Sequence, residues 1–549
     1  STPGIGVNCI RPALPEEFLD YWGYTIRENT FRFYDSIGLK NNTVFLGFPA
    51  AKHRDSTEYC PGHPSVFFKN MYKPIWDNGE NGTPVNDENY AALYIWKTVQ
   101  VYGPYVKFWE IWNEPDFDIG GNAYKPVDQE NNWWTNTPKP CETTTYTPVF
   151  NYIRLLRIAW EVIKDHDPDA LVCVGGIGYP SYLDLLLRNS DNPNDGKVSS
   201  QFPKKGGAYF DCLSYHSYPH IEGATRAWDN SINGFRHFRH SDACVDGVWK
   251  KKTDFDFVLS KYKYDGTLHP KKHWIITEFN IPRKEFGEYI GSPEAQCNFM
   301  IKTLAMAPAH DIDQMYVYNL SDNKIGPGSD NEFSFMGFYK NLEGKRPFEH
   351  EKNQLATAFK TVADQLRGAK FDAARTAALG LGQGSRGVAY KDELGRNLYV
   401  LWAETSEDRS ERASADFVFP AGLGEKYFTA TTESGASYLV NGRQIRLTGK
   451  PIFLRQTTIS ESDYDKNPRV FPNPASSSTV FSFYLFEKQP VTVELYDAKG
   501  SRVFSYFQKT ELVEGAHQVL IDGNSLESGA YFVRFTSKEG TKAVKFIQI

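Results

Sequence analysis

The chain has 549 residues, a formal net charge of −6 and a hydrophobic content of 40%. These values are typical of a globular protein of roughly two to four domains, and they exclude a disordered or fibrous chain. The near-balance of charges argues against a nucleic-acid partner, and no stretch approaches about 18 uninterrupted apolar residues, so no membrane span is predicted. Aromatic residues make up 15% of the chain, which favours surfaces that stack flat ligands.

Roughly the first 365 residues alternate short β-branched or aromatic runs with longer helical patterns, which is typical of a βα repeat with a parallel sheet. Strands are predicted at 6–11, 43–49, 106–112, 170–175, 210–218, 274–278 and 314–319. Helical patterns lie at 88–102, 148–165, 293–309 and 349–366. We therefore predict an α/β fold, a (β/α)8 TIM barrel over 1–368, although seven strands are one fewer than a closed barrel contains.

The pattern changes near residue 369 to alternating apolar and polar residues separated by turn signals, as in an all-β domain. We predict a β-sandwich over 369–458 and a second small, Ig-like all-β domain over 469–549. The polar stretch 459–468 between them is predicted to be a linker.

The seven cysteines all precede residue 300, and none forms a CxxC pair or a zinc-like spacing with histidine. An odd number leaves at least one thiol without a partner in the same chain. The sequence contains no phosphate-binding glycine loop or metal-ligand motif, so neither a metal nor an organic cofactor is predicted.

Two glutamates stand at the ends of predicted strands, where the catalytic groups of α/β barrels lie. Glu114 ends the run Phe-Trp-Glu-Ile-Trp-Asn-Glu at 108–114, and its aromatic neighbours can desolvate a carboxyl and raise its pKa. Glu278 ends a second apolar run at 273–278. Two carboxylates about 5–5.5 Å apart would suit a retaining glycosidase, whereas an arbitrary glutamate is most often an exposed loop residue.

The stretches Trp-Glu-Ile-Trp-Asn-Glu-Pro at 109–115 and Ile-Thr-Glu-Phe at 276–279 resemble clan A of the glycoside hydrolases, and most closely its family 39-like enzymes. The resemblance implies a retaining enzyme in which Glu114 is the acid/base and Glu278 the nucleophile. It also implies that Asn113 donates a hydrogen bond to the sugar 2-hydroxyl. In this alignment 6–11 becomes the second barrel strand. Either the first strand is absent from this chain, or the assignment of the strands is shifted by one element.

The resemblance suggests further substrate-site residues at the ends of other strands. His216 and Tyr218 would contact the nucleophile or the substrate, and Arg11 would support the nucleophile; a purely structural role is about equally common for His216 and Arg11. Trp112 adjoins the catalytic pair. Tyr318 occupies a position where clan members usually carry a tryptophan beneath the sugar.

Two loops add substrate clues. Trp133 and Trp134 could form a platform on which sugar rings stack, with internal packing of the loop as the alternative. The run Phe-Arg-His-Phe-Arg-His at 235–240 would suit an anionic polysaccharide, although a solvated basic face is the commoner reading of such a pattern. His220 is expected to lie in a loop without a catalytic role.

The C-terminal segment carries a second resemblance. The runs that begin at Val470, Val493, Leu526 and Lys542 resemble, in this order, the type IX secretion sorting domain of Bacteroidetes bacteria. The resemblance implies that the type IX secretion machinery is a partner and that the protein is secreted or attached to the cell surface. A carbohydrate-binding β-sandwich is the alternative.

Together these features predict a secreted retaining glycoside hydrolase that cleaves β-glycosidic bonds of a polysaccharide or oligosaccharide by double displacement. The substrate would be of plant or algal origin, with an anionic polymer as one option. A different class stays open, because fold does not dictate function. The chain could be a non-catalytic surface adhesin or carbohydrate-binding protein on a hydrolase-like scaffold.

Overall fold

A computed structural model describes residues 4–324, 330–442, 445–457, 468–475 and 477–548. The chain divides into two compact units. The first contains Ser1–Arg239, Ala243–Phe299 and Ala307–Glu351, and the second contains His240–Asp242, Met300–Met306 and Lys352–Ile549.

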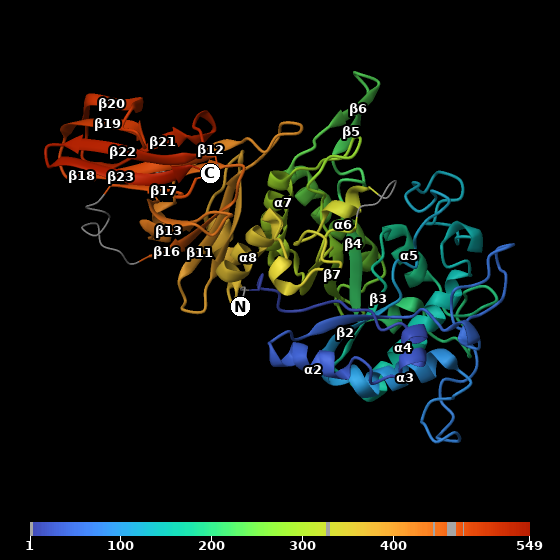
Figure 1. Ribbon diagram of the computed structural model, residues 1–549. Helices are drawn as coiled ribbons and strands as arrows, with labels where there is room; N and C mark the ends of the chain where they lie inside the picture. The colour runs from blue at the N-terminus through green and yellow to red at the C-terminus, as the bar shows by residue number, and fades with distance from the viewer. Residues whose placement is uncertain (1–3, 325–329, 443–444, 458–467, 476, 549) are drawn as a thin grey trace. The chain divides into compact units, whose positions relative to one another are not determined.

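The first unit is organised around a parallel sheet with the strand order β1-β2-β3-β4-β7-β8, which forms a half-barrel of the TIM type (Figure 1). Its strands are β1 Asn42–Leu46, β2 Val106–Ile111, β3 Leu171–Val174, β4 Cys212–Ser217, β7 His273–Phe279 and β8 Gln314–Val317. Most of their residues are buried, as expected for strands covered on both faces. Six of the seven predicted strands are confirmed within a few residues.

Helices separate the parallel strands along the chain, as βα repeats require. The described helices are α1 Glu16–Trp22, α2 Glu28–Ser36, α3 Tyr90–Tyr102, α4 Val149–His166, α5 Pro180–Arg188, α6 Ser241–Lys261, α7 Pro293–Met306, α8 Gln354–Leu366 and α9 Ala373–Ala378. None of them has an apolar stretch long enough to span a membrane.

The predicted strand at 6–11 is wrong as a regular strand. The segment does run beside β1, and the carbonyls of Ile10 and Pro12 accept hydrogen bonds from the N–H groups of Thr43 (3.1 Å) and Phe45 (3.3 Å). The pairing is incomplete because Pro12 has no N–H and the Ile10 N–H donates to the side chain of Asn42 instead (3.0 Å). With this segment, the described residues supply seven parallel segments of a barrel.

The second unit is mainly antiparallel. Its first part pairs the sheet β14-β13-β16-β11-β10-β9 with the two-stranded sheet β12-β15, and apolar residues of both sheets share one core. These strands are β9 Lys370–Phe371, β10 Ser385–Lys391, β11 Asn397–Ala403, β12 Ser414–Phe417, β13 Tyr427–Thr431, β14 Ser437–Asn441, β15 Ile445–Thr448 and β16 Ile452–Gln456.

The last part of the chain has two further antiparallel sheets, β17-β18-β21 and β20-β19-β22-β23, around a separate core. Their strands are β17 Arg469–Phe471, β18 Ser478–Leu485, β19 Gln489–Asp497, β20 Arg502–Leu512, β21 Gly515–Asp522, β22 Gly529–Ser537 and β23 Gly540–Gln548. Most of the predicted linker, 459–467, lies outside the described residues. The predicted all-β character of the C-terminal third is confirmed.

One disulfide, Cys60–Cys141, joins the loop after β1 to the loop after β2. The other five cysteines lie among the described residues and form no disulfide there: Cys9, Cys173, Cys212, Cys244 and Cys297.

Candidate active site

Side chains from the ends of β2, β4 and β7 meet at one end of the barrel sheet. At the end of β2 the backbone turns sharply, with positive φ at Trp112 (75°) and Glu114 (49°). The N–H of Glu114 donates to the carbonyl of Gly175 after β3 (2.6 Å). This close approach requires glycine, because a Cβ at Gly175 would lie 2.5 Å from the carbonyl oxygen of Ile111.

Arg11 connects three acceptors in the site. Its Nε donates to Glu110 (2.5 Å), its Nη1 to Glu278 (2.9 Å) and its Nη2 to the Oδ1 of Asn113 (2.7 Å). The guanidinium also lies 4.6 Å from the ring centre of Phe45. The planar donor fork of arginine suits such a multidentate arrangement.

Glu110 was not predicted as a site residue. It is fully buried in β2 and accepts hydrogen bonds from Ser214 (2.6 Å) and Thr277 (2.7 Å) as well as from Arg11. Burying a carboxyl group is unfavourable unless it has such hydrogen-bond partners. Its only signal in the sequence is a charged residue within the aromatic and apolar run at 108–112.

Glu278 lies between Arg11, Tyr218 and His216. The Tyr218 hydroxyl donates to its Oε2 (2.7 Å), and Nδ1 of His216 is 3.7 Å from the same oxygen. Burial raises the pKa of Glu278, but the charges of His216 and Arg11 and the Tyr218 hydrogen bond outweigh it, so the pKa lies below its ordinary value.

His216 connects the two predicted catalytic glutamates. Its Nδ1 is 2.8 Å from Oε1 of Glu114. Burial lowers the pKa of His216, but the charge of Glu278 and the hydrogen bond to Glu114 outweigh it, and the pKa lies above its ordinary value. The ring sits against Gly176, where a Cβ would be 2.1 Å from Nε2. Carboxylate oxygens of Glu114 and Glu278 and a ring nitrogen of His216 all lie within 4.8 Å of one another.

Asp116 is a second buried carboxylate that was not predicted. It accepts hydrogen bonds from the N–H groups of Gly178 (2.7 Å) and Tyr179 (2.9 Å), just before α5. Burial raises the pKa of Asp116 to about 7, although these two hydrogen bonds oppose the shift. Asp116 therefore ties the loop that carries Glu114 to the loop after β3.

The predicted aromatic residues have different surroundings. Tyr318 is partly exposed and contacts Tyr218 edge-on (ring centres 6.0 Å apart), and Phe333, which was not predicted, packs against both. Trp112 is buried, and its ring stacks on that of Phe48 with the ring centres 4.5 Å apart. Its ring therefore packs inside the protein and offers no open face to a sugar.

The sugar platform predicted at Trp133 is wrong for the observed conformation. Trp133 is fully buried and packs against Tyr179 and Tyr182, so the alternative of internal loop packing holds. Trp134 is partly exposed. His220 is buried, which lowers its pKa to about 3, and its ring contacts that of Tyr218 (6.2 Å).

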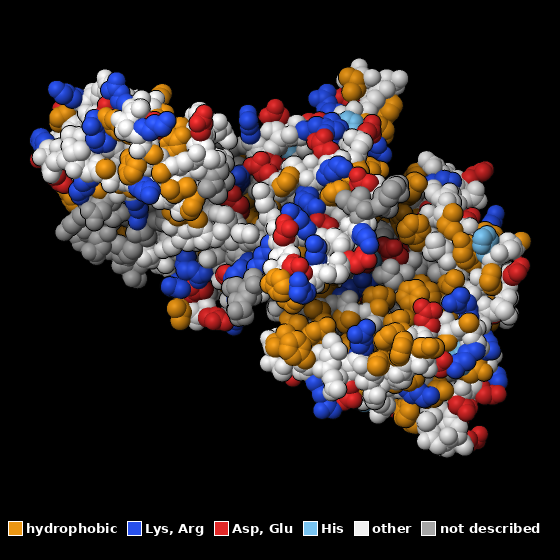
Figure 2. All heavy atoms as spheres, in the orientation of Figure 1, with side chains coloured by type: hydrophobic (Ala, Val, Ile, Leu, Met, Phe, Trp, Pro, Cys, Tyr) orange, Lys and Arg blue, Asp and Glu red, His pale blue; other side chains and the backbone are white. Residues whose placement is uncertain are grey.

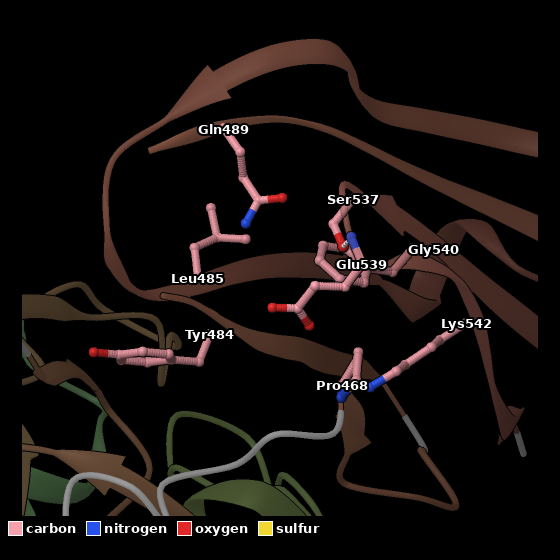
Figure 3. A pocket seen from close by; sticks show the side chains of 9 residues that line it. Pro468, Tyr484, Leu485, Gln489, Ser537, Glu539, Gly540 and Lys542 are labelled. Atoms are coloured by element: carbon pink, nitrogen blue, oxygen red, sulfur yellow. Dashed lines mark hydrogen bonds between the residues drawn. The ribbon is translucent and has the colours of Figure 1, made fainter. Parts of the chain in front are cut away.

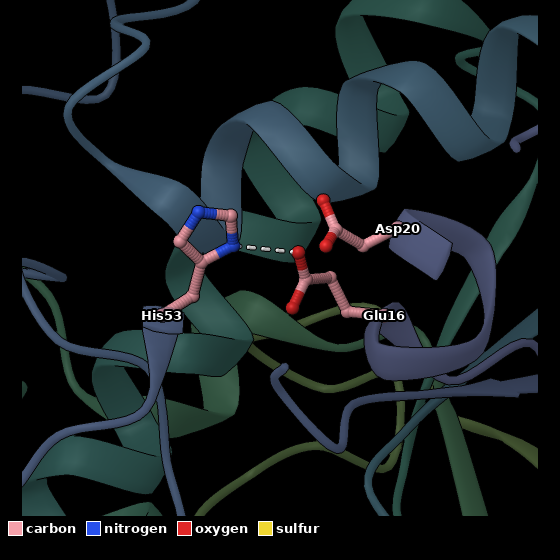
Figure 4. Close-up of side chains that lie close together, drawn as sticks. All are labelled: Glu16, Asp20 and His53. Atoms are coloured by element: carbon pink, nitrogen blue, oxygen red, sulfur yellow. Dashed lines mark hydrogen bonds and ion pairs between the residues drawn. The ribbon is translucent and has the colours of Figure 1, made fainter. Parts of the chain in front are cut away.

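Another group of donor atoms within 4.8 Å of one another consists of Glu16, Asp20 and His53 (Figure 4). Nδ1 of His53 is 2.7 Å from Glu16, which also accepts from the N–H of Ala50 (2.5 Å), and Asp20 pairs with Lys52 (2.7 Å). These bonds join α1 to the turn after β1, and we assign the group to the fold.

A small cavity in the C-terminal domain is lined by residues that include Gln489, Glu539 and Lys542 (Figure 3). The Oε1 of the buried Gln489 accepts from the N–H of Lys538 (2.8 Å). This polar lining comes from the start of β19, the turn between β22 and β23, and the first part of β23.

Comparison with known families identifies the C-terminal segment. Residues 469–549 match the model of the secretion system C-terminal sorting domain. This match indicates secretion and cell-surface attachment. No curated protein matches the chain.

Solved structures with a similar fold include glycosidases. A glucosidase from Croceicoccus marinus is 11% identical with a TM-score of 0.41, over 99% of this chain and 90% of that one. A GH30 endoxylanase from Clostridium papyrosolvens C71 is 12% identical (TM-score 0.43; 83% and 90% covered), and a family 51 α-L-arabinofuranosidase from Bifidobacterium longum is 10% identical (TM-score 0.44; 82% and 88% covered). Such distant similarity assigns no activity to this chain, and the closer assignment to family 39 stays a prediction.

Proposed function

We propose that the protein is a secreted retaining glycoside hydrolase that cleaves β-glycosidic bonds of a polysaccharide, with Glu278 as nucleophile and Glu114 as acid/base. The main support is the approach of these two carboxylates to within 4.8 Å at the ends of β2 and β7. Retaining glycosidases hold their carboxyl groups about 5–5.5 Å apart, whereas inverting enzymes leave about 6.5–9.5 Å for a water.

The different surroundings of the two glutamates support their different roles. A nucleophile must be ionised, and Glu278 is bonded by Arg11 and Tyr218, which stabilise its negative charge. Glu114 is one-third exposed and bonds to His216, so it can exchange protons with the substrate and with water.

The reaction then proceeds by double displacement. A carboxylate oxygen of Glu278 forms a bond to the anomeric carbon while Glu114 transfers its proton to the glycosidic oxygen, and the leaving sugar departs. Glu114 next removes a proton from a water whose oxygen attacks the anomeric carbon. The bond to Glu278 breaks, and both glutamates return to their starting states.

Asn113 is suited to bind the sugar beside the reacting carbon. Its Oδ1 accepts from Arg11, which orients the side chain and leaves the amide N–H groups to donate to the sugar 2-hydroxyl. Tyr318 and Phe333 provide aromatic surface at the end of β8 and in the loop that follows. The sorting domain provides the contact with the type IX secretion machinery.

The test is chemical rescue with a panel of aryl β-glycosides and the full-length protein. Glu278→Ala should lose at least about 10⁴-fold in kcat, and azide should restore turnover with a glycosyl azide of inverted configuration. Glu114→Ala with azide should give the retained configuration. The exposed Glu17→Ala serves as a control with unchanged kcat. The proposal would be overturned if Glu278→Ala kept the kcat of the wild-type protein. It would also be overturned if the wild-type protein bound glycans but hydrolysed none of them.

A further inference from the structure

A two-stranded hairpin projects from the first unit (Figure 1). It consists of β5 Arg226–Asp229 and β6 Gly234–His237, which pair only with each other. Cross-strand partners include Trp228 and Phe235. The hairpin belongs to the loop after β4, the strand that carries His216 near its end and is followed directly by Tyr218. It therefore extends from the same end of the barrel as the candidate active site.

The hairpin exposes large apolar side chains. Trp228 is 54% exposed, Phe235 47% and Ile232, in the turn, 59%. The two rings meet edge to face with centres 5.3 Å apart, and Figure 2 shows hydrophobic side chains along the projecting arm. An isolated two-stranded hairpin gains little stability from exposed apolar side chains. A contiguous exposed apolar patch, in contrast to a single exposed apolar residue, often marks a binding surface.

The hairpin also carries positive charge. Residues 226–237 contain two arginines and one aspartate, which gives a formal charge of +1, and Arg239 follows two residues later. The guanidinium of Arg226 lies 4.6 Å from the ring centre of Phe235 and is only loosely paired with Glu288 (3.4 Å). Arg236 pairs with Asp229 (2.6 Å). Arginine beside an aromatic ring can bind a sulfate or carboxylate while the ring stacks on the sugar.

The base of the hairpin is linked to the catalytic residues through His220. The ring of His220 meets the rings of Tyr218 and Tyr289 edge to face, with ring centres 6.2 Å and 5.9 Å apart. A small cavity beside it is lined by residues of the hairpin, including Arg226 and His237. A polymer that leaves the active site on this side would meet the exposed face of the hairpin.

We propose that the hairpin binds an anionic polysaccharide, with sugar rings on Trp228 and Phe235 and sulfate or carboxylate groups at Arg226. The inference rests on the proposed function in that it assigns the hairpin to the substrate of the same site. It specifies an acidic polymer as the substrate class and the hairpin as the element that selects it.

Affinity electrophoresis of full-length Glu278→Gln tests the binding without hydrolysis. The gels contain carrageenan as a sulfated polymer, alginate as a carboxylated polymer, or neutral xylan. We expect retardation by carrageenan or alginate, which distinguishes the two anionic groups, and none by xylan. Adding Trp228→Ala should weaken the binding about tenfold, while Trp228→Tyr, which keeps a stacking ring, should stay within about threefold of the parent. Arg226→Gln should reduce the dependence on salt.

The control is Phe257→Ala, which removes an aromatic ring that is still more exposed (70%) from α6 and should leave the binding unchanged. Circular dichroism checks that each variant is folded. Binding to neither acidic polymer, equal binding to xylan, or unchanged binding in Trp228→Ala would overturn the inference. Wild-type hydrolysis of aryl β-glycosides is measured separately, so a failure of the hairpin proposal is distinguished from a failure of the catalytic proposal.

Discussion

The barrel and the C-terminal domain both pair arginine with glutamate, but in opposite surroundings. In the barrel, Arg11 is almost fully buried between Glu110 and Glu278. In the C-terminal domain, Glu494 pairs with Arg502 (3.0 Å) and with Arg534, and both arginines are about half exposed. Burying charges is unfavourable unless each is bonded, so the barrel network, which buries the arginine as well, carries the larger cost. In the pairs of Glu494 only the carboxylate is buried, and both arginines keep contact with water.

The largest effect should come from removing the central cation of the barrel network. Arg11→Ala leaves two buried carboxylates without their shared cation and should lower the free energy of unfolding by about 3–5 kcal/mol. Urea unfolding followed by tryptophan fluorescence measures it. Arg11→Lys, which cannot bond all three acceptors, should recover only part of the loss. A loss below about 1 kcal/mol would contradict the role assigned to the network.

Asp116 should make the stability of the protein depend on pH. Its folded pKa, about 7, is above the ordinary value, so between about pH 4 and 7 the folded state binds more protons than the unfolded state and stability falls as pH rises. Asp116→Asn keeps both backbone hydrogen bonds and should remove this decline. The variant should therefore gain about 1–4 kcal/mol over wild type at pH 8, with no such gain near pH 4. If the free energy of unfolding of wild type and of Asp116→Asn changed with pH in the same way across this range, the raised pKa assigned to Asp116 would be contradicted.

Tyr218→Phe tests how Glu278 is kept ionised. Losing a hydrogen bond to a charged acceptor should raise the pKa of Glu278. Because activity requires the carboxylate form, the acidic limb of the kcat/KM profile should move to higher pH by roughly one unit. The profile is measured with an aryl β-glycoside that the wild-type protein hydrolyses. An acidic limb at the wild-type position would show that the tyrosine has no such effect.

The smallest effect is expected on the surface of the C-terminal domain. Arg534→Ala removes one of two half-exposed partners of Glu494 and should change the free energy of unfolding by about 0.5 kcal/mol or less. Urea unfolding under the conditions used for Arg11→Ala gives the comparison. A loss as large as that of Arg11→Ala would remove the distinction between the two regions.

The element pattern was largely predictable because it depends on neighbours in the sequence. The predicted strand at 106–112 corresponds to β2 Val106–Ile111, and the predicted helix at 148–165 corresponds to α4 Val149–His166. Hydrophobic periodicity records which face of an element is buried. The prediction at 6–11 was wrong because the incomplete pairing depends on Pro12 and on the distant side chain of Asn42.

The two glutamates were also predictable, since strand ends in a parallel barrel converge on one face. The platform at Trp133 was wrong because an aromatic residue in a polar loop has the same sequence signature whether it is buried or exposed. Only the packing against Tyr179 and Tyr182 distinguishes the two cases.

The amino-acid sequence by itself determined the order of strands and helices, the change to an all-β C-terminal third, the sorting domain and the two strand-end glutamates. Only the tertiary structure decided that Arg11 bonds Glu278, which lies 267 positions away, together with Glu110 and Asn113. The physical reason is that local periodicity records burial, whereas hydrogen bonds among buried charges depend on how distant strands align when the barrel forms.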